Sequence, residues 1–382
     1  SFFLWNTISI INLDEQGDKQ MGLLKETLQF IEPLNKEAMK KAWDRLDSLS
    51  KPIGSLGELE NIIAKMAGIT GNIHNKINKK NVVIMCSDNG VVEEDVSNCP
   101  KSVTATVTNN FTKKITGVYV LSKFSGSDIT VVDVGIDADL NNPKVINKKI
   151  AYGTMNMMKG PAMTREQTIK AIEVGIETVD NLVLDGYDLF GTGEMGVGNT
   201  ATSAAILSVF SGLEVEESVG KGSGITDEQF INKKRVIKRS IEVNNPDKND
   251  VIDVISKVGG FDIAGLCGCF LAAAKNRVPI VIDGFIASAA ALCAYKLNPL
   301  VIGCIFASHL SAEPGAAFIM KEIGLKPMLN LNMRLGEGSG CPLAFNIIEA
   351  ALYTMNNMGT FEDAKLDSKK YIDIRENPVE IS

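Results

Sequence analysis

The residue with the clearest potential for chemistry is Glu337, in the segment Met333-Arg-Leu-Gly-Glu-Gly-Ser-Gly340. Because Gly336 and Gly338 flank it, a ligand could approach this carboxylate without obstruction from neighbouring side chains. Partial desolvation would raise its pKa toward the range of a general base. Glutamates are also common in exposed loops. The segment therefore predicts either a proton acceptor or a solvated surface residue.

A second segment, Gly191-Thr-Gly-Glu-Met-Gly-Val-Gly-Asn-Thr200, contains the candidate ligand-binding residues Glu194, Gly196, Gly198 and Asn199. Glycines allow close approach of the backbone, and the free N–H groups at the start of a following helix bind anions. The spacing is neither a Walker A loop nor the dinucleotide fingerprint in its usual position. The segment therefore predicts a phosphate cradle or, alternatively, a tight strand-to-helix turn.

Two further places hold polar side chains of interest. Lys233 follows the glycine-rich run Val219-Gly-Lys-Gly-Ser-Gly224 and could neutralise a phosphate as a point charge, although most helical lysines are simply solvated. Ser311 and Glu313 lie in Ala307-Ser-His-Leu-Ser-Ala-Glu-Pro-Gly315, where they predict hydrogen bonds in a pocket or else a polar loop. A Ser-His-Asp hydrolase is disfavoured because no nucleophile elbow of the form G-x-S-x-G is present.

The elements that must position these residues are buried strands alternating with helices. Short apolar runs end in Asp, Asn, Ser or Gly, at residues 82–87, 129–134, 187–190, 278–282 and 300–306. Helical patterns separate the later runs, at residues 164–184, 199–210 and 285–295. This alternation predicts a parallel sheet covered by helices on both faces, with ligands bound beyond the carboxyl ends of the strands.

The two ends of the chain have a helical pattern instead. Apolar residues recur at three-to-four spacing over residues 20–72, with turn residues interrupting at 50–57 and a helix predicted from about 58 to 66. A further helix is predicted from about 344 to 355, and the charged tail from Thr360 is expected to pack on the N-terminal helices.

Composition excludes several classes of protein. The 382 residues carry a net charge of −7 without a block of like charges, so no nucleic-acid partner is expected. Seven cysteines without a CxxC pattern favour a reducing cytoplasm over a disulfide framework or zinc site, and two histidines exclude a His-rich metal site. No apolar stretch reaches about 18 residues, so no membrane span is expected. Residues 1–12 are apolar but lack the basic start and cleavage site of a secretory signal.

The combination of segments resembles the nicotinate-nucleotide–dimethylbenzimidazole phosphoribosyltransferase family, over about residues 46–351. Beyond the segments quoted above, those that carry the resemblance are Leu46-Asp-Ser-Leu-Ser-Lys-Pro-Ile-Gly-Ser-Leu-Gly-Glu-Leu-Glu60, Asp88-Asn-Gly-Val-Val-Glu-Glu94, Gly153-Thr-Met-Asn156, Gly160-Pro-Ala-Met-Thr164, Gly259-Gly-Phe-Asp-Ile-Ala-Gly265 and Ile282-Asp-Gly-Phe285. So many segments in one order make a chance match very improbable.

The resemblance implies a Rossmann-like α/β domain, residues 79–344, and a small helical domain formed by residues 20–78 and 345–382. It implies that nicotinate mononucleotide donates its phosphoribosyl group to a base nitrogen with inversion at C1′, without a metal or redox cofactor. Members are typically dimers. Glu337 matches the family's catalytic glutamate, the Glu194–Asn199 turn its nucleotide-binding turn, Lys233 its phosphate-pairing lysine, and Ser311 and Glu313 its ribose and nicotinate pocket.

The chain departs from the family where the incoming base is received. Relatives commonly have Asp-His-Gly where this chain has Asp88-Asn89-Gly90, and an aromatic residue where Cys99 precedes Pro100. The Gln of a common Val-Thr-x-Gln-Met pattern is replaced by Thr106. We expect Asp88, Asn98 and Thr106 to lie near the acceptor. Dimethylbenzimidazole leads as acceptor; the alternatives are a phenol or p-cresol, used by a heterodimer with a paralogue, and a catalytically silent partner subunit.

Overall fold

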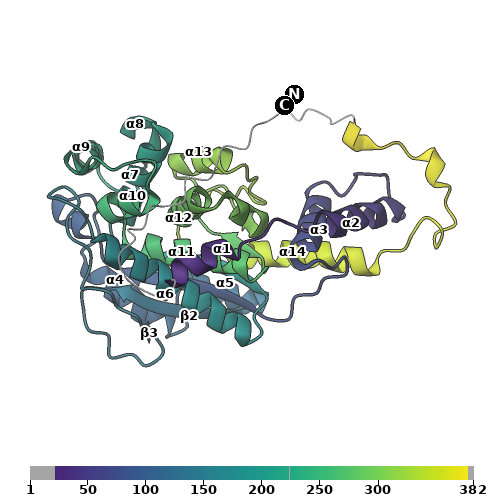
Figure 1. The fold of residues 1–382 in the computed structure, drawn as a ribbon, viewed down its shortest axis with the longest axis horizontal. Coiled ribbons are helices and arrows are strands. Elements are labelled where there is room, and N and C mark those ends of the chain that lie inside the picture. The colour runs from purple at the N-terminus through teal and green to yellow at the C-terminus, as the bar shows by residue number, and fades with distance from the viewer. Residues whose placement is uncertain (1–21, 223, 377–382) are drawn as a thin grey trace.

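A six-stranded parallel sheet forms the centre of the computed structural model, which describes residues 22–222 and 224–376 (Figure 1). Its strand order is β3-β2-β1-β4-β5-β6. The strands are β1 Lys80–Ser87, β2 Asp128–Gly135, β3 Ile146–Asn147, β4 Leu189–Met195, β5 Ile280–Ile282 and β6 Ile305–Ala307. The predicted α/β class and parallel sheet are confirmed.

The side of the sheet on which successive strands are added changes between β1 and β4. The chain adds β2 and β3 on one side of β1, and then β4, β5 and β6 on the other. Loops leave the carboxyl ends of β1 and β4 in opposite directions at such a point and open a crevice there. The sheet therefore places its natural ligand site beside residues 88–90 and 196–198.

Helices cover both faces of the sheet, and β1 shows how. Met85 contacts α11 at Gly265, whereas Val82 and Ile84 face the loop that precedes α14. On the first face lie α11 Phe261–Lys275 and α12 Phe285–Leu297, and on the second α5 Gly117–Ser125 and α14 Cys341–Asn357. Strands buried on both sides read as continuous apolar runs, which explains why the sequence revealed them.

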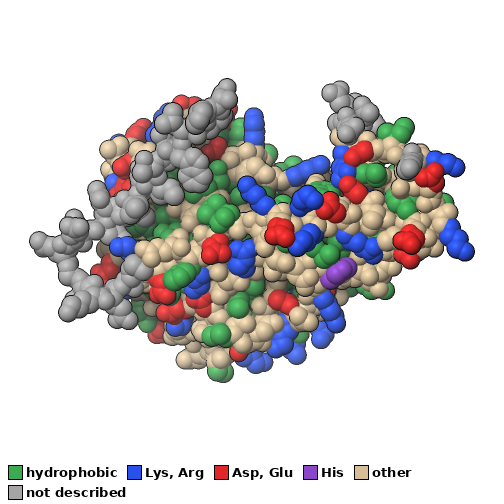
Figure 2. Space-filling view, turned by 45° about the vertical axis from the view of Figure 1, so that its right-hand side comes forward, with side chains coloured by type: hydrophobic (Ala, Val, Ile, Leu, Met, Phe, Trp, Pro, Cys, Tyr) green, Lys and Arg blue, Asp and Glu red, His purple; other side chains and the backbone are tan. Residues whose placement is uncertain are grey.

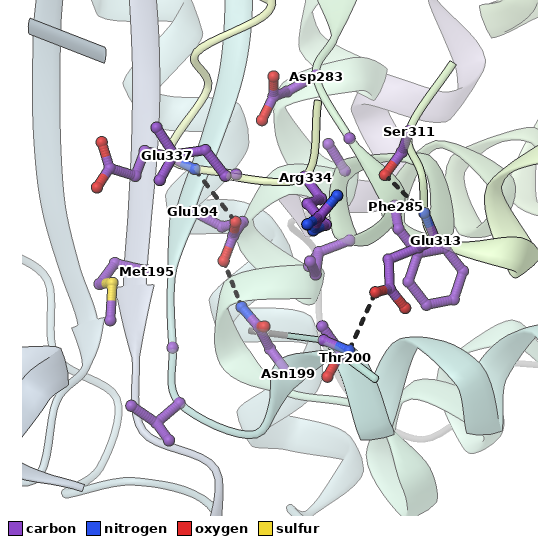
Figure 3. A pocket seen from close by; sticks show the side chains of 18 of the residues that line it. Glu194, Met195, Asn199, Thr200, Asp283, Phe285, Ser311, Glu313, Arg334 and Glu337 are labelled. Carbon is purple, nitrogen blue, oxygen red and sulfur yellow. Dashed lines mark hydrogen bonds between the residues drawn. The ribbon is translucent and has the colours of Figure 1, made fainter. Parts of the chain in front are cut away.

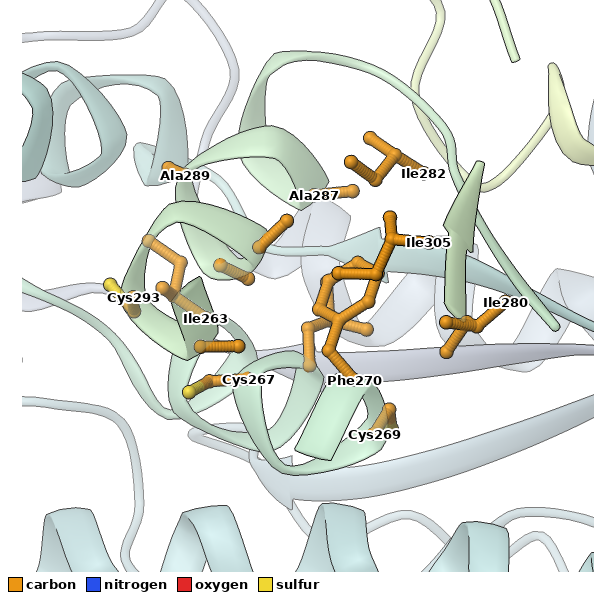
Figure 4. Packing of buried hydrophobic residues seen from close by; sticks show 14 of the residues in the cluster. Ile263, Cys267, Cys269, Phe270, Ile280, Ile282, Ala287, Ala289, Cys293 and Ile305 are labelled. Atoms are coloured by element: carbon orange, nitrogen blue, oxygen red, sulfur yellow. The ribbon is translucent and has the colours of Figure 1, made fainter. Parts of the chain in front are cut away.

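The core is densest where α6 Arg165–Leu184 packs on α11. An added Cβ at Gly175 would lie 1.8 Å from the Gly265 carbonyl oxygen, and one at Gly268 would lie 1.9 Å from the Ile172 carbonyl oxygen. These glycines let the two helices approach closely enough to bring their backbones into contact. Phe270 of α11 then packs toward Ile280 and Ile305 of the strands (Figure 4).

The N-terminal helices α2 and α3 form a helical unit with the end of α14, beside the sheet (Figure 1). The C-terminal tail packs on this unit as predicted: Thr360 pairs with Leu49, and Arg375 lies 2.9 Å from Asp47. α1 lies instead against α6 and α11. The bounds are α1 Leu23–Gln29, α2 Lys36–Ser48 and α3 Glu58–Thr70. The exact division into two domains stays a prediction.

Three local predictions were wrong. The run at 187–190 does not end at Gly191; β4 continues to Met195, because these glycines leave room for Cys341 and the Glu337 carbonyl against the strand. Most of 300–306 is a 3-10 helix, Pro299–Cys304, whose first residue is a proline that favours a helix start. The helix predicted at 58–66 runs to Thr70, where Gly71 adopts the left-handed conformation that ends it.

The other predicted helices are confirmed within three residues, as α6, α7 Asn199–Ser211, α12 and α14. The remaining helices are α4 Ser102–Phe111, α8 Val215–Ser218, α9 Asp227–Asn244, α10 Val251–Val258 and α13 Pro314–Glu322, with short 3-10 turns at Gly90–Glu94, Ser368–Lys370 and Ile374–Glu376.

The surface and the cysteines agree with the composition. Lys and Arg lie interspersed with Asp and Glu on the face in Figure 2. All seven cysteines are free, and six of them are buried. Within residues 22–222 and 224–376, no helix is long and apolar enough to cross a membrane. The segment 1–12, expected not to be a secretory signal, lies outside the described residues.

Candidate functional site

A cavity of about 260 Å³ lies beyond the carboxyl ends of β4, β5 and β6. It is the site that the strand order predicts, and most of the candidate residues line it (Figure 3). The predicted residues that do so are Glu194, Gly196, Gly198, Asn199, Ser311, Glu313, Gly336 and Glu337. Segments far apart in the sequence therefore meet at one place.

The base of the cavity is a network of buried carboxylates around Glu194. Asn199 donates from its amide nitrogen to Glu194 and, at 3.0 Å, to Asp262. Burial raises the pKa of Glu194 to about 8 and that of Asp262 to about 6, although the Asn199 amide acts in the opposite direction. Near pH 7 Glu194 therefore carries a proton for much of the time.

Asp283, at the end of β5, holds the loop that carries Glu337. Its two carboxylate oxygens accept hydrogen bonds from the backbone N–H groups of Gly338, at 3.0 Å, and Gly340, at 2.7 Å. Burial raises the pKa of Asp283 to about 7 despite these donors. The loop is thus fixed to the sheet by backbone contacts, independently of its own side chains.

The Glu337 backbone has an unusual conformation. Gly336, Glu337 and Gly338 have φ values of 80°, 63° and 94°, all in the left-handed region that non-glycine residues rarely adopt. A Cβ at Gly336 would lie 2.5 Å from Glu194 Oε1, and one at Gly338 would lie 2.6 Å from Val82 Cγ1. The glycines on both sides of Glu337 are therefore structural requirements of this turn.

The Glu337 carboxylate lies at the N-terminus of α5. Its Oε2 accepts a hydrogen bond from the Val118 backbone N–H at 3.2 Å, and the carboxylate points away from Glu194 and Glu313 (Figure 3). Burial raises its pKa, whereas the N–H groups of Val118 and Gly117 lower it. The side chain is half-buried and anchored, so the interpretation of Glu337 as a freely solvated surface residue is wrong.

Glu313 and Ser311 form the opposite wall. Glu313 Oε1 accepts a hydrogen bond from Gly222 N–H at 3.0 Å, and the N–H of Glu313 donates to Ser311 Oγ at 3.3 Å. The second oxygen, Oε2, is buried without a hydrogen-bond partner among the described residues. A buried carboxylate oxygen without a donor is costly, so this atom suits a ligand that brings a hydroxyl group.

Lys233 lies one layer behind the cavity. It is buried, with an exposed fraction of 1%, so the interpretation as a solvated helical lysine is wrong. Its Nζ donates to Thr200 Oγ1 at 2.8 Å and to the Gly220 carbonyl oxygen at 3.1 Å. Burial lowers its pKa to about 8. Its ammonium group therefore lies next to Thr200, at the start of α7. Thr200 lines the cavity, as does Gly222.

The remaining predicted residues lie around the cavity but do not line it. Gly338 is in the supporting turn, and Asp88 is buried behind Asn89, with one oxygen bound to the N–H of Asp137. Asn98 donates to the Gly224 carbonyl oxygen at the rim. Thr106 is exposed on α4, where its hydroxyl donates to the Ser102 carbonyl oxygen. Of its neighbours on α4, Val103 and Val107 line the cavity instead.

Sequence reasoning missed several lining residues. The missed apolar lining residues are Val103 and Val107 of α4, Met195, Phe285, Ile286 and Leu335, and Figure 3 shows Met195 and Phe285 on opposite sides of the cavity. Helical periodicity would have placed Val103 and Val107 on one face, because they are four residues apart. Arg334 and Asp283 were also missed, although Asp283 directly follows a predicted strand. Within the described ranges, no group of three or more His, Cys, Asp or Glu side chains could hold a metal ion.

Comparisons with known proteins agree on one family. Residues 31–366 match a family described as phosphoribosyltransferase. Nicotinate-nucleotide–dimethylbenzimidazole phosphoribosyltransferases of Clostridium tetani and Clostridium acetobutylicum are 61% and 56% identical, and each alignment covers more than nine-tenths of this chain and 99% of the relative. The crystal structure of the enzyme of that name from Thermus thermophilus superposes with a TM-score of 0.83 at 32% identity, covering 87% of this chain and 99% of that one.

Proposed function

The chain belongs to the nicotinate-nucleotide–dimethylbenzimidazole phosphoribosyltransferase family, and we propose that it carries out this reaction in the cavity at the carboxyl edge of the sheet. The enzyme transfers the 5-phosphoribosyl group of nicotinate mononucleotide to a lower-ligand base of cobamides, giving an α-ribazole-type 5′-phosphate and nicotinate. The observation that carries the assignment is that one cavity brings together polar residues, here called the polar wall, and the apolar residues Val103, Val107 and Leu335, here called the apolar wall, with Glu337.

The polar wall is the proposed donor site. The α7 N-terminus is capped by Gly198, at φ 88°. The N–H groups of Asn199 and Ala201 already donate to the Gly196 and Gly198 carbonyl oxygens, but the positive end of the helix dipole still favours an anion such as the 5′-phosphate. Lys233 adds a positive charge through Thr200, to which it donates a hydrogen bond. The unpartnered Glu313 Oε2 would accept from a ribose hydroxyl, and Arg334 would face the carboxylate of the nicotinate ring.

The apolar wall is the proposed acceptor site. Val103 and Val107 of α4 and Leu335 all line the cavity, and apolar side chains of this kind could pack against a flat aromatic base. In the reaction, a lone pair of one base nitrogen attacks C1′ while the bond from C1′ to the nicotinate nitrogen breaks. The proton on the acceptor's other nitrogen passes to Glu337. Because the Val118 N–H occupies Oε2, the Oε1 atom is the one we assign to that proton.

The alternatives of the sequence analysis are less well supported. The relatives quoted above are named for dimethylbenzimidazole, so we propose a benzimidazole and not a phenol as the acceptor. Retention of Glu337, Glu194 and Lys233 in one connected site supports an active chain over a silent partner subunit. An assay with dimethylbenzimidazole, adenine, phenol and p-cresol would decide. Product from a phenol alone would refute the benzimidazole assignment.

Substitution of Glu337 by Gln tests the mechanism. Since an amide cannot take the proton, we expect turnover to fall by about 10²- to 10⁴-fold, with nicotinate mononucleotide bound within about twofold of normal. Turnover would be followed by nicotinate release, and donor binding by calorimetry. The matched control is Glu362→Gln, on the exposed tail, which should leave both values unchanged. Near-normal turnover of Glu337→Gln would remove the proton-acceptor role.

The assembly and location of the protein are further proposals. We propose a homodimer, with a heterodimer of paralogous chains as the alternative, because Ile115 and Leu335 expose apolar surface on either side of Gly117. Light scattering of the purified chain would distinguish a dimer from a monomer. The free cysteines support a reducing compartment, and we propose the cytoplasm.

A further inference from the structure

A second cavity, of about 560 Å³, lies at the opposite edge of the sheet from the catalytic one. It opens where β1 and β2 begin and where α5 ends. The lining residues that matter here are Asn81, Tyr119, Ser122, Lys123, Asp128 and Tyr187. A volume of this size accommodates a small organic molecule.

Two buried polar atoms in this cavity have no hydrogen-bond partner among the described residues. They are Asn81 Oδ1 and Ser122 Oγ, whose residues are each only 1% exposed. A buried polar atom left unpaired is destabilising, and native structures contain few of them. Both residues line the cavity, so a rotation of either side chain would bring its unpartnered oxygen within reach of a molecule that occupies it.

The lining indicates the chemistry of the occupant. Among its described residues, the cation Lys123 is matched by one carboxylate, Asp128, which already accepts a hydrogen bond from the Tyr187 hydroxyl at 2.8 Å. The carbonyl end of α5 carries a partial negative charge, which disfavours an anion. Asn81 Oδ1 requires a donor, and Tyr119 and Tyr187 offer aromatic surface. An uncharged heterocycle with several hydroxyl groups, such as a nucleoside without phosphate, fits all of these groups.

The same helix connects this cavity with Glu337. Ser122 lies one helical turn after Val118, whose N–H is bound to Glu337 Oε2. The start of α5 is in tight contact with the catalytic loop, since a Cβ at Gly117 would lie 2.6 Å from Leu335 Cδ2 and 3.4 Å from Glu337 Oε2. A molecule that fixes the end of α5 therefore also fixes the group that holds Glu337.

We propose that this second cavity binds a nucleoside or a similar uncharged, hydroxylated heterocycle, and that its binding slows turnover by holding α5 against Glu337. The binding claim stands without the proposed function, whereas the effect on turnover rests on it. Because coupling between two sites is reciprocal, loss of the Glu337 contact weakens binding of the nucleoside in turn.

The binding claim is tested by calorimetry with adenosine as the probe, in the presence of saturating nicotinate mononucleotide to occupy the catalytic cavity. Ser122→Ala removes one of the two unpartnered atoms, and should weaken adenosine binding about five- to tenfold. The matched control is Ser125→Ala, in the same helix, whose hydroxyl already donates to the Ser122 carbonyl oxygen and does not line the cavity. Tyr119→Leu provides a second variant on the same wall.

Adenosine binding that is weakened in Ser122→Ala and Tyr119→Leu but kept in Ser125→Ala would support the site. No binding at millimolar adenosine, or equal binding by all variants, would overturn it. For the coupling, saturating adenosine should lower kcat about fivefold, and the adenosine concentration that gives half of this effect should be about five- to tenfold higher in Ser122→Ala. Glu337→Ala should bind adenosine about fivefold more weakly. Unchanged adenosine affinity in Glu337→Ala would overturn the coupling even if the protein proved inactive.

Discussion

The helical unit and the cavity beyond β4, β5 and β6 both bury titratable side chains, but they stabilise them differently. In the helical unit, Lys51 Nζ lies 2.7 Å from Glu60 Oε1, and both side chains are almost completely buried. Leu56 N–H donates to the same oxygen at 3.1 Å. In the cavity, Glu194 and Asp283 are bound by neutral donors, namely the Asn199 amide and backbone N–H groups.

The kind of partner, a cation or a neutral donor, distinguishes a structural carboxylate from one typical of a functional site. A buried ion pair keeps both members charged and fixes the segments that carry them. A buried carboxylate without a cation has a strongly perturbed affinity for protons and for ligands, which is typical of functional sites. The raised pKa values, about 8 for Glu194 and about 7 for Asp283, result from this burial without a neighbouring cation.

The largest effect on stability is expected where the helical unit loses its cation. Lys51→Met leaves Glu60 buried without a counter-charge, which costs about 3–5 kcal/mol. Lys40→Ala is the control, because it breaks only the exposed pair with Asp44 and should cost less than about 0.5 kcal/mol. Urea unfolding measures both. If Lys51→Met cost no more than Lys40→Ala, the buried pair would not be a structural element of the helical unit.

A smaller effect is expected from the turn that Asp283 supports. Gly338→Ala forces a side chain into a left-handed conformation and against Val82 and Gly193, which should cost about 2–4 kcal/mol and reduce kcat at least about tenfold. Gly186→Ala is the control, since Gly186 has a φ of 85° with nothing near the added Cβ. It should cost about 1–2 kcal/mol without changing kcat. Equal kcat values in the two variants would contradict the role of the turn.

The smallest effect, expressed per pH unit, is a change in the pH dependence of stability. Between pH 4.5 and about 8, native Glu194 holds a proton that the unfolded chain has lost, so its contribution to stability falls as pH rises through this window. One such group contributes a slope of at most about 1.4 kcal/mol per pH unit. Glu194→Gln should remove this slope from unfolding free energies measured between pH 5 and 8, whereas Glu362→Gln should leave it. An unaltered slope in Glu194→Gln would mean that Glu194 is not protonated in the native protein.

The parts of the fold that depend on short-range patterns could be predicted from the sequence. Continuous apolar runs mark β1 and β2, and a capping box at Thr164 and Gln167 marks the start of α6. The end of β4 could not be predicted, because glycines usually indicate a turn. Here they lie within the strand and leave room for Cys341 beside it. Only tertiary packing distinguishes the two uses.

For the site, residue type identified the glutamates but not their surroundings. The sequence could not indicate that α5 holds Glu337, because residues 118 and 337 are brought together only by the folded sheet. The burial of Lys233 was equally hidden, since its helix carries other lysines and arginines that stay solvated. Contacts between segments far apart in the sequence determine the surroundings of both side chains. Such contacts cannot be predicted from residue type and local spacing alone.

The division of the cavity between elements also has an evolutionary consequence. In the proposed arrangement, α4 supplies the wall that faces the acceptor, whereas β4, the loop after it and the Glu337 turn supply the groups for the donor and for proton transfer. Substitutions at Val103 or Val107 can therefore accumulate without disturbing the transfer chemistry. A duplicated copy of such an enzyme could change its choice of base through one helix, so diversification of the acceptor requires few mutational steps.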